Sequence, residues 1–143
     1  MRHRVQYSKS KVQHSKSKKR KGILSAELIF TLPILGLVMF GLFEFSLLFL
    51  ARGELADASR AAARKASLPG VSAEQVELEV RKILPARLQD SLQVRVDGGT
   101  RTGDLVTVSI AVPMRNAAPD FLWPIGYSLK NRNLYHTTRM IKE

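Results

Sequence analysis

The stretch LIFTLPILGLVMFGLF, residues 28–43, decides the fold, because its sixteen residues carry no charge. The wider segment 23–51 holds only two charged side chains, Glu27 and Glu44. An α-helix rises 1.5 Å per residue, so about 20 residues cross the ~30 Å hydrocarbon core of a bilayer. A soluble helix of this length would show a polar face, and residues 28–43 show none. The pattern predicts a transmembrane helix over residues 23–51.

The basic residues are concentrated ahead of this helix. Residues 1–22 hold nine Lys or Arg and no acid. Residues 23–143 hold the other 14 of the 23 basic residues and all 12 acidic residues, so their charges nearly balance. The positive-inside rule then predicts a cytoplasmic N-terminus and an exported C-terminal part. A membrane-tethered nucleic-acid binder that uses residues 1–21 is the weaker interpretation, because Tyr7 is the only aromatic residue there and offers no stacking platform. We expect no specific nucleic-acid partner.

A cleaved secretory signal is a competing interpretation of the apolar segment. Such a signal has an apolar region of about 7–15 residues that ends in a small-x-small cleavage site. The run here is longer, and LFLARGELA, residues 48–56, offers no such site. Removal of the helix by an ordinary signal peptidase is therefore not expected.

Each of the two acids has two interpretations. A carboxylate at the bilayer centre costs about 2.5–3.5 kcal/mol on insertion scales and usually has a partner. Glu27 is either an interfacial residue or the partner of a free amine. A cut after Gly22 would make Ile23 the new N-terminus, and the acid of one subunit could then neutralise the amine of the next and set the axial register of the helices. Glu44 is either protonated, or near the outer interface, or an intramembrane contact between subunits.

The residues around these acids resemble the TadE-like family of pseudopilins from tight-adherence pilus systems. The resemblance covers residues 22–67 and rests on these positions: Gly22, Glu27, Leu32-Pro33, GLFEF at residues 41–45, and the Ala/Arg-rich stretch from Ala58 to Ala66. The basic leader, the glycine and the glutamate five residues later are also similar to the processing site of type IV pilin-like proteins. Leu28 stands where major small pilins have tyrosine, which favours the pseudopilin branch. The leader departs from the family in being long and Lys/Ser-rich, with SKSK at residues 8–11 and 15–18.

The resemblance implies a function in pilus biogenesis. A prepilin peptidase would cut between Gly22 and Ile23, and Glu27 would serve peptidase recognition and helix register. The protein would be a single-pass component of the bacterial inner membrane, with its C-terminal head in the periplasm or outside the cell. It would act as a filament subunit or as an assembly factor of a tight-adherence pilus or secretion machine. Its partners would be the peptidase, other pilin-like subunits, pilus assembly proteins and membrane lipid.

Residues 52–143, called the head below, are expected to form a small α+β domain that follows the long helix. The stretch GELADASRAAARKAS, residues 53–67, should continue that helix, with a packed stripe formed by Leu55, Ala58, Ala62 and Ala66. LPG at residues 68–70 breaks it. A second helix then begins at a capping box, Ser72 with Gln75, and a hydrophobic staple, Val71 with Val76. Its buried face is predicted to hold Val76, Val80, Ile83 and Leu84, and Pro85 ends it.

An antiparallel sheet is predicted after the second helix. LQVRV, residues 92–96, and LVTVSIAV, residues 105–112, read as strands around a turn. Alternation places these side chains on one face of the second strand: Val106, Val108, Ile110 and Val112. Residues 128–142 are ambiguous and are compatible with a last antiparallel strand.

The stretch APDFLWPIGY, residues 118–127, is an aromatic loop with two interpretations. Either the loop packs over the sheet, or Phe121, Leu122 and Trp123 form an exposed contact for a partner or for the bilayer surface.

The sequence offers no catalytic or metal-binding pattern. It has no cysteine, and the three histidines, His3, His14 and His136, stand in no ligand spacing. It contains no nucleophile elbow, phosphate-binding loop or dinucleotide fingerprint. We therefore expect no enzyme, cofactor or metal. The remaining rival is an uncleaved single-pass anchor whose exported domain binds an envelope partner.

Overall fold

The structure is a computed structural model that describes residues 21–99 and 101–143, with side chains from residue 26 onward. The predicted leader therefore lies outside the described residues except for Lys21 and Gly22. The chain divides into two compact units between Ile34 and Leu35. The elements are α1 Lys21–Ala66, α2 Ala73–Ile83, α3 Ala86–Gln89, β1 Gln93–Gly98, β2 Leu105–Pro113, α4 Met114–Ala117, η1 Trp123–Ile125 and β3 Asn133–Ile141.

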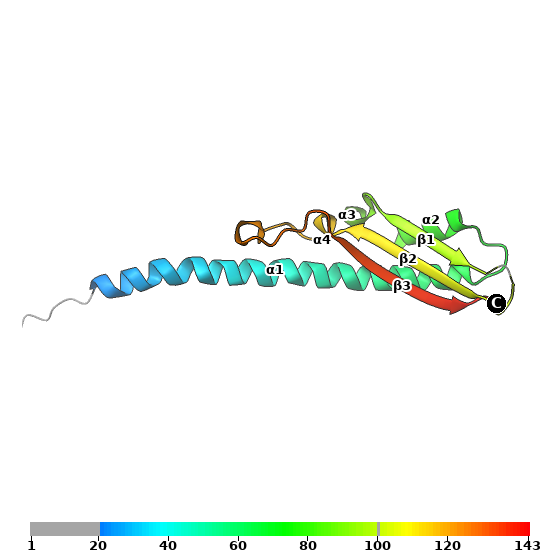
Figure 1. Ribbon diagram of the computed structural model, residues 1–143, viewed down its shortest axis with the longest axis horizontal. Helices are drawn as coiled ribbons and strands as arrows, with labels where there is room; N and C mark the ends of the chain where they lie inside the picture. The colour runs from blue at the N-terminus through cyan, green and yellow to red at the C-terminus, as the bar shows by residue number, and fades with distance from the viewer. Residues whose placement is uncertain (1–20, 100) are drawn as a thin grey trace, which may run out of the picture. The chain divides into compact units, whose positions relative to one another are not determined.

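The helix α1 confirms the long apolar N-terminal helix that the sequence predicts. It runs for 46 residues and continues through Pro33 (Figure 1). Within the described part of the chain, its segment Ala26–Ala66 is long and apolar enough to cross a membrane. No break marks the expected boundary between residues 51 and 52, so the membrane limit at that position stays a prediction.

The second half of α1 packs through a stripe of small side chains. The predicted stripe is confirmed, because all four of its members are buried: Leu55, Ala58, Ala62 and Ala66. Leu48, Ala51 and Ala63 extend the same buried face, and the core cluster joins them to the valines of β2. Alanine projects only a methyl group, so this face leaves room for larger core side chains to pack over the helix.

The start of α2 follows the predicted capping box. Ser72 Oγ accepts a hydrogen bond from the backbone N–H of Gln75 at 3.4 Å, and the Gln75 side chain accepts one from the N–H of Ser72 at 3.2 Å. These two bonds satisfy donors that the first turn of a helix otherwise leaves unpaired.

The buried face of α2 differs from the prediction at one residue. Val76, Val80 and Leu84 are buried as expected, but Ile83 is 41 % exposed. The helix ends at Ile83, and Leu84 adopts an extended conformation, with φ −73° and ψ 135°. Leu84 enters the core in this way and Ile83 remains at the surface, so the assignment of Ile83 to the buried face was wrong.

The three strands form one antiparallel sheet in the order β1-β2-β3. The predicted inward face of β2 is confirmed, since these residues are buried: Val106, Val108, Ile110 and Val112. The ambiguous segment 128–142 contains β3, which pairs with β2 over its full length. The architecture is therefore α+β, a long apolar helix followed by short helices and a three-stranded sheet.

A long excursion connects β2 to β3. The last pair of the ladder joins Pro113 to Asn133, and the N–H of Met114 donates to the carbonyl of Arg132 at 2.8 Å. Residues 114–132 thus leave and re-enter the sheet at one point, and Figure 1 shows part of this connection running beside α1. Hairpin loops usually have 2–5 residues, and longer ones are often functional.

Candidate functional site

The N-terminal part of α1 carries the predicted processing site. The bond between Gly22 and Ile23 lies near the start of α1, which begins at Lys21. Glu27 is exposed, and its backbone carbonyl accepts a hydrogen bond from Thr31 Oγ1 at 2.8 Å. The roles of these residues in cleavage, recognition and helix register stay predictions.

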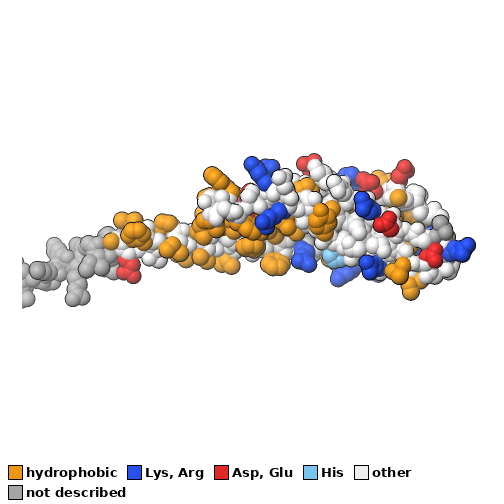
Figure 2. Space-filling model, viewed as in Figure 1, with side chains coloured by type: hydrophobic (Ala, Val, Ile, Leu, Met, Phe, Trp, Pro, Cys, Tyr) orange, Lys and Arg blue, Asp and Glu red, His pale blue; other side chains and the backbone are white. Residues whose placement is uncertain are grey.

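The surface of α1 is apolar over its N-terminal half. Large hydrophobic side chains are exposed along the helix from Leu28 to Leu50. Figure 2 shows hydrophobic side chains gathered along α1, whereas Lys, Arg, Asp and Glu lie mainly over the elements of the head. A helix surface of this kind is suited to contact lipid or other apolar helices.

Glu44 is fully buried within its own chain. Its Oε2 atom accepts hydrogen bonds from the backbone N–H groups of Phe121, at 2.8 Å, and of Leu122, at 3.2 Å. Its Oε1 atom is also buried and has no hydrogen-bond partner among the described residues. A buried carboxylate is costly unless it is hydrogen-bonded, so these two bonds offset part of the cost of placing Glu44 in an apolar helix. A contact of Glu44 with another subunit stays a prediction.

The segment of residues 118–127, called the aromatic loop below, packs on α1. The ring of Phe121 lies 5.4 Å from that of Phe40 and 6.3 Å from that of Phe43, measured between centroids. Leu122 packs over the backbone of Gly41. A Cβ atom added at Gly41 would lie 3.7 and 3.8 Å from the two methyl carbons of Leu122. The loop thus packs on the helix in the structure, whereas the first interpretation had it over the sheet.

Of the three predicted contact residues, the structure exposes two. Phe121 is 42 % and Trp123 is 67 % exposed, whereas Leu122 is only 6 % exposed. Leu122 is buried because the hydrogen bond to Glu44 and the contact with Gly41 turn it toward α1. Ile125, which the sequence analysis did not single out, is 56 % exposed and adds to the same apolar surface.

The side chain of Asp120, at the start of the aromatic loop, binds the residues that follow the end of the loop. One carboxylate oxygen accepts a hydrogen bond from Ser128 Oγ at 2.8 Å, and the other accepts one from the N–H of Leu129 at 3.3 Å. Gly126 ends the 3₁₀ turn η1 with φ 89°, a conformation that favours glycine. Leu129 is fully buried and anchors the returning chain. The sequence assigned this stretch to a loop but did not indicate the closing role of Asp120.

Ser59 joins α1 to β3 beneath the sheet. Its Oγ lies 3.0 Å from the carbonyl of Ala56, 2.7 Å from His136 Nδ1 and 2.7 Å from Thr138 Oγ1. The carbonyl only accepts, so with the Ser59 hydroxyl donating to it, the His136 Nδ1–H and the Thr138 hydroxyl donate to Ser59. His136 therefore has a structural partner, which no local sequence spacing could reveal.

Ion pairs tie the short helices to α1. Lys65 Nζ lies 2.7 Å from Glu79 Oε2 of α2, and Arg87 Nη2 lies 2.6 Å from Glu54 Oε2. The hydrogen bond from Lys65, and then its charge, hold the pKa of Glu79 below its usual value. These pairs fix the positions of α2 and α3 on α1.

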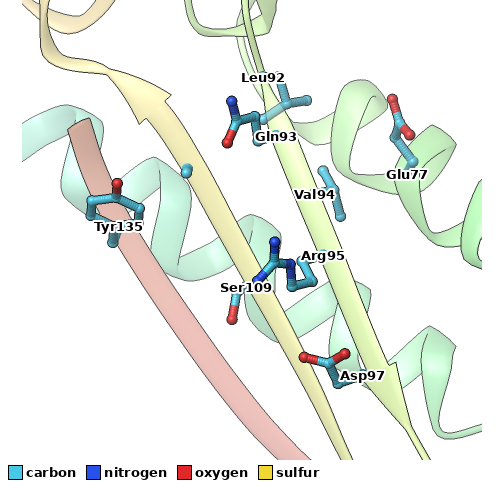
Figure 3. Close-up of a pocket in the computed structure, with 9 residues that line it drawn as sticks. Glu77, Leu92, Gln93, Val94, Arg95, Asp97, Ser109 and Tyr135 are labelled. Carbon is cyan, nitrogen blue, oxygen red and sulfur yellow. The ribbon is translucent and has the colours of Figure 1, made fainter. Parts of the chain in front are cut away.

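The outer face of the sheet carries an open groove of about 650 Å³. Figure 3 shows its polar lining on adjacent strands, with Arg95 and Asp97 of β1, Ser109 of β2 and Tyr135 of β3. Across the described residues, 21–99 and 101–143, no group of three His, Asp or Glu side chains is arranged to hold a metal ion. The polar side chains that line the groove can donate and accept hydrogen bonds.

One comparison with known proteins finds a similarity to a family over part of the chain. Residues 22–64 match the model of the family described as TadE-like protein. The match confirms the resemblance seen in the sequence and covers the apolar half of α1 together with most of its alanine-rich continuation. Comparisons with curated proteins and with solved structures give no match.

Proposed function

We propose that the protein is a minor, pilin-like component that acts in assembly of a tight-adherence type pilus or a related secretion machine. The match of residues 22–64 to the TadE-like family is the observation that carries this proposal, since it suggests a pilus-related function. Proteins of this type are structural components of pilus assembly, in keeping with the expected absence of enzymatic activity.

Processing by a prepilin peptidase is part of this proposal. The matched region begins at Gly22, directly after the basic leader and five residues before Glu27. Removal of the leader would place a free amine at Ile23, one helical turn from the exposed carboxylate of Glu27. Between parallel helices, an amine and a carboxylate that neutralise each other lower the cost of both charges in the membrane.

The proposed location is the bacterial inner membrane. The apolar surface of α1 supports a single span, and the basic leader supports a cytoplasmic N-terminus. The head then lies in the periplasm or at the cell exterior. The proposed partners are the prepilin peptidase, other pilin-like subunits with their assembly proteins, and membrane lipid.

A pilus assay in the native host tests this function. A strain without the protein should lose its surface pili, and the wild-type chain supplied in trans should restore them. Normal pili in the deletion strain would contradict the proposal. A strain that keeps its pili but loses binding of an envelope molecule would instead support the uncleaved anchor, whose head would bind through a surface such as the groove on the sheet.

A further inference from the structure

The aromatic loop has the composition of a membrane-contacting segment. Three of its side chains are large, apolar and exposed: Phe121, Trp123 and Ile125. Trp and Tyr are enriched where proteins meet the boundary between lipid and water, because their rings are amphipathic. Leaving these side chains in water would be unfavourable by about 25 cal/mol for each Å² of apolar surface.

The loop continues the apolar surface of α1. Phe121 packs against Phe40 and Phe43, and both of these α1 residues are themselves half exposed. The exposed parts of these three rings therefore form one surface, and whatever covers Phe40 and Phe43 also reaches Phe121. Since α1 is apolar over this segment, lipid is the occupant that fits.

Several backbone N–H groups of the loop are paired within the protein, which lowers the cost of contact with lipid for these groups. Irregular backbone is tolerated at membrane depth only where its polar groups are satisfied within the protein. Glu44 accepts the N–H groups of Phe121 and Leu122, and Asp120 accepts that of Leu129. The turn itself pairs the N–H groups of Ile125, Gly126 and Tyr127 with carbonyls of the loop, and Pro124 has no N–H.

The length of α1 places the loop at a membrane boundary. Residues 23–43 number 21, close to the roughly 20 residues that a helix needs to cross the ~30 Å hydrocarbon core. Glu44 then lies at the edge of the core nearer the head, and Phe121, level with Phe40 and Phe43, lies just inside it. Exposed Lys130 and Arg132 follow the loop, and Arg132 lies 5.0 Å above the ring of Tyr127.

We propose that the aromatic loop inserts into the leaflet nearer the head and is a second lipid contact of this protein beside α1, with Glu44 as the residue that holds it there. The inference rests on the proposed membrane insertion of α1. The exposed side chains of Phe121, Trp123 and Ile125 then contact lipid.

The single tryptophan of the chain makes this testable by fluorescence, because Trp123 is the only Trp in the sequence. The full chain is reconstituted at high lipid-to-protein ratio in phosphatidylethanolamine and phosphatidylglycerol vesicles. Some vesicles contain lipid brominated near the glycerol end of its acyl chains, and iodide is the aqueous quencher. The control is the double variant W123F/Y135W, which moves the tryptophan to the 67 % exposed position of Tyr135 on β3.

The expected result is strong quenching of Trp123 by brominated lipid and an iodide quenching constant severalfold lower than that of the control. Glu44→Leu should raise iodide quenching of Trp123 while the protein stays in the vesicles, whereas Glu44→Gln, which keeps an acceptor oxygen, should change it less. Iodide access equal to the control would overturn the proposal. Protection that disappears as protein is diluted in lipid would also overturn it, in favour of a contact between subunits.

Extraction by carbonate distinguishes a failure of the loop contact from a failure of the membrane insertion of α1. Protein that stays in carbonate-washed vesicles with an iodide-accessible Trp123 overturns the loop contact alone. Protein released by carbonate overturns the insertion of α1, on which the loop contact depends.

Discussion

The carboxylate of Glu44 accepts a hydrogen bond from the backbone N–H of Phe121 at 2.8 Å, although the two residues lie 77 positions apart. This bond links the apolar part of α1 to the excursion between β2 and β3. It gives an acid in an apolar helix a partner within its own chain and fixes the position of the aromatic loop.

Replacing Glu44 should free the aromatic loop. Glu44→Leu leaves the N–H groups of Phe121 and Leu122 without their acceptor, and an unsatisfied buried donor costs about 1–3 kcal/mol. The loop should then be cut by chymotrypsin in detergent micelles, while the rest of the head resists. Glu44→Gln is the control and should remain largely protected. Equal resistance of Glu44→Leu and wild type would show that the bonds do not hold the loop.

The alanines of α1 should resist enlargement. Ala62 is fully buried beneath the sheet, so Ala62→Leu should destabilise the head by about 1–3 kcal/mol through overpacking. Ala61 is the control, because it is only half-buried and borders an open cavity of about 370 Å³, where a larger side chain has space. Denaturant unfolding of both variants measures the difference. Similar losses at the two positions would mean that core packing over Ala62 is not the constraint.

Ser59 should contribute more stability than an equivalent surface hydroxyl. Ser59→Ala leaves His136 and Thr138 without their shared partner beneath the sheet, at a cost of about 1–3 kcal/mol. Ser109 also bonds a threonine hydroxyl, that of Thr137 at 3.0 Å, but on the exposed face. Ser109→Ala should therefore change the free energy of unfolding by only about 0.5 kcal/mol. A reversal of this order would refute the assigned network.

Acid should weaken the contact between α1 and α2. The pKa of Glu79 is lowered by Lys65 in the folded protein, so its stabilising contribution is present above the unfolded value, near 4.5, and is lost as pH falls through the folded value. Glu79→Gln should therefore lower the unfolding midpoint at pH 7. Its effect should shrink at acidic pH, where Glu79 of the wild type is protonated in both the folded and the unfolded state. Glu77→Gln, on the same helix but paired with Arg81, controls for loss of an acid from α2. An effect of Glu79→Gln that does not change with pH would exclude this linkage.

Glu27 should affect assembly more than insertion. If the acid sets the register between subunits, Glu27→Ala should still enter the membrane but co-purify less with other pilus subunits. Glu74→Ala, which removes another exposed acid at the start of α2, is the matched control. Unchanged co-purification of Glu27→Ala would exclude the register role.

Sequence patterns predicted the features that depend on near neighbours in the chain. The apolar run of α1, the capping box at Ser72 and the alternation in β2 each follow from local periodicity, and all three are present. Ile83 was misassigned because α2 ends there and the next residue turns into the core, which helical periodicity alone does not indicate.

The contacts of the site depend on distant parts of the chain. The sequence left three interpretations of Glu44 open and did not indicate its donors, which are backbone N–H groups of an irregular loop and carry no sequence signature. His136 looked isolated because Ser59 lies 77 positions away. Leu122 looked equivalent to its aromatic neighbours, and only the packing against Gly41 distinguishes it.

The most direct measurement is the intact mass and N-terminal residue of the protein isolated from native membranes. The account predicts a chain that starts at Ile23, which would mean that a prepilin peptidase recognises the segment and that Glu27 has an amine to neutralise. A chain that starts at Met1 would contradict processing after Gly22 and would favour an uncleaved single-pass anchor.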